Sequence, residues 1–309
     1  LEFRRVLFRS NRLGKIVIPL VYEKLNDFKN EHAVCSKDGK FGIIDKNNYL
    51  TIKPEYDWIE AYSNFIRAKK NGNYGLLSAK ENTIIPFEFE RIDKTDCGIF
   101  LLVKNGKYGF AEESGCLITD INNDFDSRFQ VEDLYSKPEK QEKQLYLKIY
   151  QNEKPGIVNQ NGKVIIEPGT YDDVSVPSNG MISVFRKGKF EFYDIKQTKM
   201  IRQKYDQYAH FFREKAIVKK NDKMIIIDKN GKELFTDICE KIERLHISDN
   251  YYFLVTKKGL KGLLTSDLKW LIPAEFELIS WDYPNFITLQ KDEKNNVFSI
   301  SQNKIIWKE

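Results

Sequence analysis

The sequence is poor in the residues that most often carry chemistry. Its 309 residues include three histidines and four cysteines, all scattered along the chain. His32, His210 and His246 form no metal-binding spacing, and the chain contains no phosphate loop, dinucleotide fingerprint or serine-nucleophile motif. We therefore expect a protein that is not an enzyme, with no catalytic residue, no metal and no cofactor.

The four cysteines contain no CxxC pair, which argues against a structural zinc site. We interpret them as buried or half-buried thiols on strands. A bridge between Cys97 and Cys116 is the one alternative, because both residues fall within a single repeat. Cysteine pairing cannot be read from sequence alone, so that alternative stays open.

Long apolar runs are also missing. A membrane-spanning helix needs about 18 or more consecutive apolar residues, whereas the longest runs here, such as Met224–Ile227, have the length of a strand. We expect no transmembrane segment.

An excess of one charge is missing as well. The chain carries 50 Lys and Arg against 45 Asp and Glu, a net charge of +5. Leu1–Ser10 reads as a translated linker, and its three arginines and one glutamate account for +2, which leaves 5 − 2 = +3 for the remainder. Basic and acidic residues alternate throughout, and a nucleic-acid footprint would cluster the basic ones. We therefore expect no nucleic-acid partner.

The sequence does contain internal repeats. An aromatic residue followed by glycine recurs just after a tight polar turn, at Gly42, Gly75 and Gly109, which lie 33 and 34 residues apart. Continuing in that register gives eight anchor positions with spacings of 33, 34, 47, 35, 34, 37 and 36, the last of them at Phe298. A fixed period of this size is typical of stacked repeat units.

Each repeat reads as three short strands. An alternating run such as Phe100–Lys104 leads into a two-residue turn such as Asn105-Gly106, and the chain returns as the anchor strand. A second polar turn, as at Asn161-Gly162, precedes a third apolar run. Proline is expected to close that third run, because its missing N–H is tolerated at strand ends and edges. The prolines concerned are Pro19, Pro54, Pro86, Pro168 and Pro273.

These features predict an all-β protein built as a tandem array of about eight units of roughly 35 residues, each made of short antiparallel strands. A single hairpin is marginal in water, so the units must stack to bury a core. We favour an open, solenoid-like array. The alternative is a closed, propeller-like array, which a fourth strand within Tyr56–Tyr62 would supply.

An aromatic residue paired with an acid follows the third run in most repeats. Because a catalytic group needs to occur once, in a cleft, this recurrence predicts packing by the ring between units and a turn or rim contact by the carboxylate. The flanking acids Glu88 and Glu275 are interpreted as solvated edge charges. The pairs are Tyr22-Glu23, Tyr56-Asp57, Phe89-Glu90, Tyr171-Asp172, Tyr205-Asp206 and Phe276-Glu277.

The long spacing of 47 residues marks an insertion and divides the chain. We expect a linker at residues 1–10, a first group of repeats at 11–123, a charged insertion at 124–144 and a second group of repeats at 145–309. The insertion is interpreted as a solvated loop, with a partner-docking loop as the alternative. Because the chain enters at a third run, we expect upstream repeats or an upstream domain, and leave the choice between a cytoplasmic and an exported protein open.

At these residues the sequence resembles the WG-repeat family, also called KWG repeats, of bacterial proteins. The aromatic-glycine pair is kept at Phe41-Gly42, Tyr74-Gly75 and Tyr108-Gly109, while Gly156 and Gly262 keep the glycine alone. The order of turn, anchor strand and I-I-P run matches across about residues 11–309. The resemblance implies a β-rich repeat scaffold with a binding role, and it brings no catalytic residues.

Aromatic residues in the connections after the third strand are the candidate binding surface. We expect a non-catalytic scaffold that binds a protein or peptide partner, because projecting aromatics on one face form rigid anchors. The alternative is a cell-envelope or glycan-binding module, or the targeting arm of a larger enzyme. The structural alternative is that these rings cover the ends of the core between units. The residues are Trp58, Tyr62, Tyr208, Phe211, Phe212, Trp281 and Tyr283.

Overall fold

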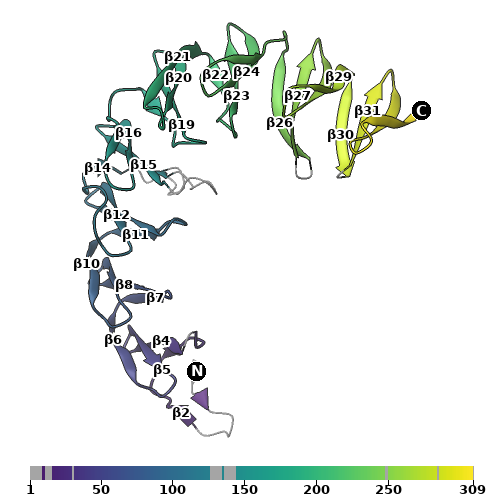
Figure 1. Ribbon diagram of the computed structural model, residues 1–309. Coiled ribbons are helices and arrows are strands. Elements are labelled where there is room, and N and C mark those ends of the chain that lie inside the picture. Colours follow the sequence, from purple (N-terminus) through teal and green to yellow (C-terminus); the bar gives the residue numbers. More distant parts are fainter. Residues whose placement is uncertain are drawn as a thin grey trace. The chain divides into compact units, whose positions relative to one another are not determined.

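A computed structural model describes residues 9–10, 16–29, 31–125, 134–135, 144–247, 250–283 and 285–308, with residues 9–10 and 282–283 described by their backbone only. The predicted all-β class is confirmed: small antiparallel sheets follow one another along the chain, and the described ranges contain no α-helix (Figure 1). The chain divides into two compact units, residues 1–168 and 169–309. Each unit is described by itself below.

In its described residues, the first unit holds a two-stranded sheet, three four-stranded sheets and one three-stranded sheet, each made of strands that are consecutive in sequence. The strands are β1 (Arg9–Ser10) and β2 (Ile16–Ile18); β3 (Lys24–Leu25), β4 (His32–Lys37), β5 (Lys40–Asp45) and β6 (Leu50–Tyr56); β7 (Trp58–Ala61), β8 (Ile66–Lys70), β9 (Asn73–Leu77) and β10 (Thr83–Phe89); β11 (Arg91–Lys94), β12 (Ile99–Lys104), β13 (Lys107–Glu112) and β14 (Asn123–Asp124); and β15 (Tyr146–Gln151), β16 (Lys154–Asn159) and β17 (Val164–Ile166).

The second unit holds four sheets of four strands each, again from consecutive strands. The strands are β18 (Asp173–Val174), β19 (Met181–Arg186), β20 (Lys189–Asp194) and β21 (Lys199–Tyr205); β22 (Gln207–Tyr208), β23 (Lys215–Lys220), β24 (Lys223–Asp228) and β25 (Glu233–Phe235); β26 (Lys241–Ile247), β27 (Asn250–Lys257), β28 (Leu260–Thr265) and β29 (Trp270–Phe276); and β30 (Leu278–Tyr283), β31 (Phe286–Lys291), β32 (Lys294–Ser299) and β33 (Lys304–Lys308).

Most sheets therefore have one strand more than the three predicted for each repeat. The extra strand is the segment directly after the aromatic-acid pair, and it opens the next sheet rather than closing its own. Thus β6 ends at Tyr56, and β7 begins at Trp58 as the first strand of the following sheet. The segment was hard to recognise because it is only two residues long in β3, β18 and β22.

A two-residue turn joins the central hairpin of every sheet from β4–β5 onward. Both turn residues have positive φ, as at Asn71 (52°) and Gly72 (84°). This is the type I′ geometry, whose twist matches that of the flanking strands and which Asn and Gly adopt at little cost. The second turn is held by a side chain that accepts from the backbone, as Asp45 does from Asn47 and Tyr49 at 2.8 Å.

The prediction that proline closes the third run is wrong for three repeats. Pro54, Pro86 and Pro273 lie inside β6, β10 and β29, which continue to the aromatic residue. Each strand bulges there, since Phe41 pairs with Tyr56 but Ile43 pairs with Ile52. A bulged residue has no ladder partner, so the missing N–H of proline is tolerated inside the strand.

The bulge leaves no room for a side chain at the anchor position, which explains the glycine there. A Cβ on Gly42 would lie 2.6 Å from the Ile52 carbonyl oxygen and 2.8 Å from the Pro54 nitrogen, and Gly75 and Gly262 are similarly crowded by β10 and β29. A glycine is therefore needed at the anchor position, because the bulged strand of the same sheet approaches its backbone closely.

The anchor position predicted for the last repeat, Phe298, is wrong by two residues. In the other repeats the anchor position is the third residue of its strand, as Gly262 is in β28, where it pairs with Val255 of the preceding strand. In the last sheet Asn296 takes this place, opposite Leu289. The last spacing is therefore 296 − 262 = 34, in line with the others.

The core consists of clusters shared by consecutive sheets. One cluster joins Ile43 and Ile52 of the sheet β3–β6 to Ile66 and Leu77 of the sheet β7–β10. Equivalent clusters join β7–β10 to β11–β14 in the first unit, and β22–β25 to β26–β29 in the second. Consecutive sheets within a unit thus bury their facing sides, as a stacked repeat requires.

Both the buried ring and the turn contact are observed for four of the six aromatic-acid pairs, because Tyr171 is only half-buried and Glu277 lacks the turn contact among the described residues. The rings of Tyr22, Tyr56, Phe89, Tyr205 and Phe276 are buried. The carboxylates accept a hydrogen bond of 2.9 to 3.1 Å from a backbone N–H of the next hairpin turn, whereas Glu277 makes no such bond within the described residues. Two further acids, Asp124 and Glu240, do the same. The bonded pairs are Glu23 with Gly39, Asp57 with Gly72, Glu90 with Asn105, Asp124 with Glu153, Asp172 with Lys187, Asp206 with Asn221 and Glu240 with Gly259.

Some of these carboxylates also connect consecutive sheets. Asp57 accepts from Lys40 of β5 at 2.5 Å and from Gly72 of the following hairpin at 3.1 Å. Asp124 and Asp206 repeat the arrangement with a lysine that begins the anchor strand. The lysine hydrogen bond and the turn amide lower the pKa of all three carboxyl groups. The recurring lysine and acid therefore form a staple between repeats.

The predicted insertion at 124–144 lies largely outside the described residues. Leu134 and Tyr135 are described, and both are buried in a core cluster together with Leu147. The interpretation as a solvated loop does not hold for these two residues, because a bridge between Tyr135 and Leu147 holds them against β15.

None of the four cysteines forms a disulfide, so the alternative of a bridge between Cys97 and Cys116 is wrong. Cys35 and Cys239 are buried, Cys97 is half-buried and Cys116 is exposed. Burial raises the pKa of Cys35 and Cys239 to about 11, so these thiols stay protonated near neutral pH.

Candidate recognition site

Three of the seven candidate aromatic residues occupy one equivalent position. Tyr62, Phe212 and Tyr283 each pair with the residue three places further on, across a tight turn that leads into the central hairpin. Tyr62 stacks on Phe65 with 4.6 Å between ring centroids, and its hydroxyl donates to Glu60 at 2.6 Å. The side chain of Tyr283 lies outside the described residues.

The other four candidates do not join them. Trp58 lies on β7 with its ring edge against Tyr74, and Tyr208 on β22 faces Phe190 and Phe192 of the preceding sheet. Phe211 is buried in the core at 2% exposure and so contributes no surface. Trp281 on β30 is 37% exposed. The described candidates of the second unit therefore do not form one continuous aromatic face.

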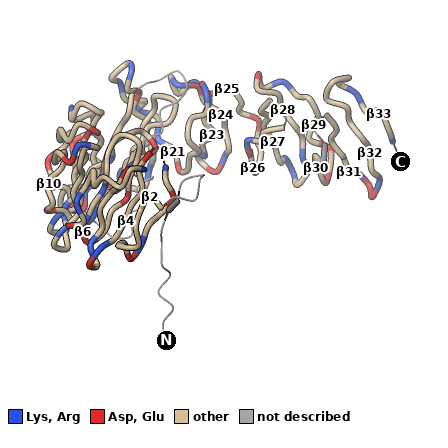
Figure 2. The backbone as a smooth tube through the Cα atoms, turned by 90° about the horizontal axis from the view of Figure 1, so that it is seen from below, with Lys and Arg blue, Asp and Glu red and all other residues tan. Residues whose placement is uncertain are grey.

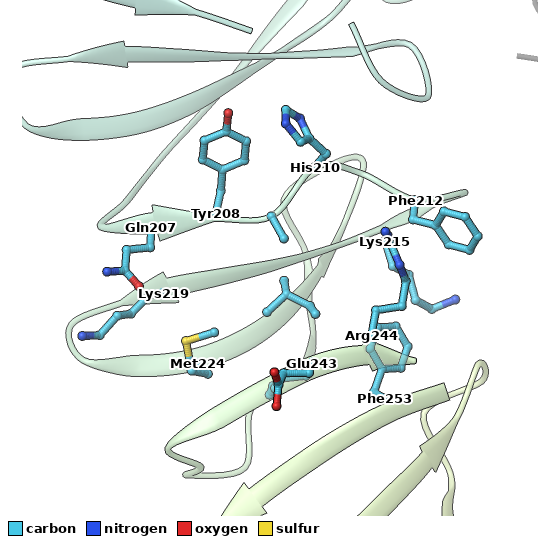
Figure 3. A pocket seen from close by; sticks show the side chains of 13 residues that line it. Gln207, Tyr208, His210, Phe212, Lys215, Lys219, Met224, Glu243, Arg244 and Phe253 are labelled. Atoms are coloured by element: carbon cyan, nitrogen blue, oxygen red, sulfur yellow. The ribbon is translucent and has the colours of Figure 1, made fainter. Parts of the chain in front are cut away.

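A cleft of about 350 Å³ lies in the second unit where the sheet β22–β25 meets the sheet β26–β29 (Figure 3). Ligand sites in proteins typically begin at this size. Apolar side chains form the walls, and polar and cationic side chains stand at the ends. Tyr208 and His210 project away from Met224 and Glu243 in Figure 3. The apolar lining residues are Ala209, Ile217, Met224, Ile242 and Phe253, and the polar ones at the ends include Gln207, Lys215, Lys219 and Arg244.

Basic groups gather at one end, which we call the arginine end. Lys215 and Arg244 line the cleft there, and Arg213 lies just outside the lining, against the ring of Phe212. The guanidinium carbon of Arg244 lies 4.2 Å from the Phe212 ring centroid, and that of Arg213 lies 5.6 Å from it. Arg213 also lies 4.9 Å from the ring of Tyr251. Aromatic faces hold guanidinium groups by cation–π attraction, so these two side chains have defined positions.

The electrostatics of this end are unbalanced. Among the described residues, no carboxylate lies within salt-bridge distance of Arg213, Lys215 or Arg244. Burial lowers the pKa of Arg244, and burial together with the charge of Arg244 lowers the pKa of His210. Both shifts are the response expected of basic groups without a compensating acid.

Sequence reasoning found Phe212 and Tyr208 but missed the cations beside them. Arg213 lies in the tight turn of residues 212–215, and Arg244 comes from the next sheet, thirty-two residues after Phe212. A signal was present: aligning repeats by their hairpin turns shows that Lys94 occupies the position of Arg244 in the first unit. That alignment requires knowing which residues pair between β11 and β12 and between β26 and β27, and the sequence alone does not give these pairings.

Charges elsewhere are mixed. Basic and acidic residues are interspersed along most of the chain (Figure 2). Within the described part of the chain, no three His, Cys, Asp or Glu side chains come close enough together to hold a metal ion. The same residues include no helix with the length and apolar character needed to cross a membrane.

The sequence profile of the family described as WG containing repeat matches residues 10–41, 41–74, 74–108 and 156–190. The matched segments run from one anchor position to the next, and three of them abut in the first unit. These four segments are WG repeats, which confirms the resemblance drawn from the aromatic-glycine pairs. No curated protein matches the sequence.

Solved structures resemble the chain only at a distance. A structure described as a eukaryotic initiation factor has 7% identity and a TM-score of 0.37, covering 93% of this chain and 87% of that one. Hsv2 of Kluyveromyces lactis has 10% identity and a TM-score of 0.29, covering 78% and 92%. The dihydro-heme d1 dehydrogenase NirN has 10% identity and a TM-score of 0.31, covering 94% and 72%. Likenesses this weak carry no argument about function.

Proposed function

We propose that this WG-repeat protein is a non-catalytic scaffold that binds a protein or peptide partner, and that the cleft between β22–β24 and β26–β27 is the contact site. The observation that carries the proposal is the cleft itself, which combines apolar walls with polar ends. Such a combination suits a short peptide segment, because the walls bury side chains while the ends fix direction and register.

The recurring acids support a non-catalytic role. Glu88 and Glu90 are the nearest approach in the sequence to a catalytic carboxylate pair. Glu90 accepts from the Asn105 amide at 2.9 Å, and Glu88 pairs with Lys104 at 2.9 Å. Each carboxylate is thus engaged in holding a turn or a strand edge, as the repeat pattern predicts.

The test is a selection of random dodecapeptides displayed on phage against the full immobilised chain. The proposal expects enriched peptides that bind saturably when they are synthesised, labelled and titrated by fluorescence anisotropy. No enrichment over a bare surface would overturn it.

Co-sedimentation with purified peptidoglycan tests the glycan-binding alternative in parallel. We expect no saturable binding. Saturable binding that persists at high salt would replace the proposal with a cell-envelope function, because glycan contacts by stacking and neutral hydrogen bonds are little screened by salt.

A further inference from the structure

The arginine end of the cleft has the composition of a carboxylate-binding site. Arg244 lines the cleft with its guanidinium on the ring of Phe212, and Lys215 lines it at the same end (Figure 3). The guanidinium of Arg213, which does not itself line the cleft, contacts the same ring. Guanidinium groups bind carboxylates through paired N–H donors, and fixing them beforehand reduces the entropy lost on binding.

The acids nearest in sequence are engaged elsewhere. Glu214, in the same turn as Arg213, pairs with Lys229 at 3.0 Å. Glu243, beside Arg244 on β26, itself lines the cleft, and its carboxylate pairs with Lys241 at 2.8 Å. The surplus positive charge therefore has no acid of the described residues to neutralise it, and its complement is an acidic group from outside the chain.

The length of the cleft and the edge of β26 indicate which kind of molecule carries that acidic group. The cleft follows β23 from Lys215 to Lys219, a length of about 13 Å at the usual strand rise. That length fits four or five extended residues. β26 is the terminal strand of its sheet, so no described strand pairs with its outer edge, and an extended peptide can hydrogen-bond there.

We infer that the cleft takes an extended peptide whose Asp or Glu carboxylate binds Arg213 and Arg244 and whose apolar side chain lies between Ile217 and Ile242. This inference rests on the proposed function and adds the chemistry of the partner. A lysine, Lys219, stands at the opposite end and is already paired with Asp222 at 2.9 Å, so the acid of the peptide binds at the arginine end.

The experiment uses the peptides recovered in the dodecapeptide selection. Acidic residues are expected to be enriched beside apolar ones. Replacing the acid of a selected peptide by its amide is expected to weaken binding to the unmodified protein at least tenfold. The protein variant R213Q/R244Q is expected to bind the acidic peptide and its amide with affinities within twofold of each other, because the partner of the carboxylate is gone.

The outcomes separate the two claims. Failure to enrich any peptide would overturn the proposed function and this inference together. Enriched peptides without acids, or a loss of less than twofold on amide replacement, would overturn the inference and leave peptide binding in place. The matched control is R202Q, an exposed arginine on β21 outside the cleft, which is expected to keep both the affinity and the tenfold preference. Equal thermal midpoints check that the variants fold.

Discussion

The first and second units place different side chains at equivalent positions between two consecutive sheets. In the first unit, where β7–β10 meets β11–β14, Arg67 crosses the gap. Its Nη1 donates to the Ile92 carbonyl and its Nη2 to Glu60, both at 2.6 Å, and its guanidinium carbon lies 5.3 Å from the ring centroid of Trp58. An arginine with its partners thus occupies the space between the sheets.

In the second unit the same register positions leave that space open. Measured from the hairpin turns, Ile217 takes the place of Arg67, and Ala209 that of Glu60. The cation from the next sheet also differs. Lys94 pairs with Glu113 at 3.0 Å, whereas its counterpart Arg244 has no acid partner among the described residues. The two units thus share one backbone arrangement, and a few side chains decide whether the space between two consecutive sheets is filled or open.

The largest effect is expected when the side chains that fill the junction in the first unit are introduced at the equivalent positions of the second unit. The variant A209E/I217R introduces the crossing arginine and its acid into the cleft. We expect selected peptides to lose about 100-fold in affinity by fluorescence anisotropy, because the arginine occupies the apolar floor.

A matched control exists for this variant in the last sheet. Ser280 pairs with Thr288 in the same register as the positions changed above. S280E/T288R is expected to leave the affinity unchanged. Unaltered peptide binding by folded A209E/I217R would refute the assignment of the cleft.

The bulge glycines give the next largest effect. The first unit keeps four of them, at positions 42, 75, 109 and 156, and the second keeps one, at 262. Gly42→Ala is expected to destabilise the protein by about 2 kcal/mol in urea unfolding, since its Cβ would meet backbone atoms that cannot move aside. Gly188→Ala is the control: it has positive φ (76°) but open space, so about 1 kcal/mol is expected. Equal costs at the two sites would contradict the account of the bulge.

Removing Arg67 from the first junction tests the same difference between the two units through protein stability. Arg67→Met is expected to cost about 1–2 kcal/mol in urea unfolding, because the Ile92 carbonyl and Glu60 lose their donor. Arg244→Met in the second unit is expected to cost under about 0.5 kcal/mol, since no hydrogen bond or ion pair holds its guanidinium among the described residues, only the ring of Phe212. If the two substitutions lower the free energy of unfolding by the same amount, the claim that Arg67 fills its junction and Arg244 does not is wrong.

The smallest effect concerns the staples that both units share. The pKa of Asp57 is lowered on folding, so its contribution to stability is present above its unfolded pKa and is lost as pH falls through the lower folded value. Asp57→Asn is expected to lower the thermal midpoint by about 1–3 °C at neutral pH, and by less below about pH 3. A deficit that grows on acidification would show that the carboxylate charge does not stabilise the fold.

Much of the fold follows from local chemistry and was predictable. Turn residues such as Asn71-Gly72 and acids such as Asp57 specify their own contacts within about fifteen residues. Asp124 and Glu240 were missed because Asn123 and Cys239 replace the aromatic that flagged the other acids. The insertion also separates Asp124 from its turn partner by 29 residues.

The candidate site was only partly predictable. Aromatic residues were visible in the connections, and Phe212 does stand at the arginine end. The cleft itself depends on which side chain faces the next sheet at residues 209 and 217, and strand register decides that. The strand that precedes residue 209, β22, is only two residues long, so hydrophobic alternation in the sequence does not reveal this register.

Hydrogen–deuterium exchange of the full chain, with and without a selected peptide, tests the central claim most directly. Binding in the cleft predicts slower exchange in residues 207–219 and 241–247, with the junction around Arg67 unchanged. Protection confined to other sheets, with none at β22, β23 or β26, would contradict the claim that the hollow junction is the recognition site.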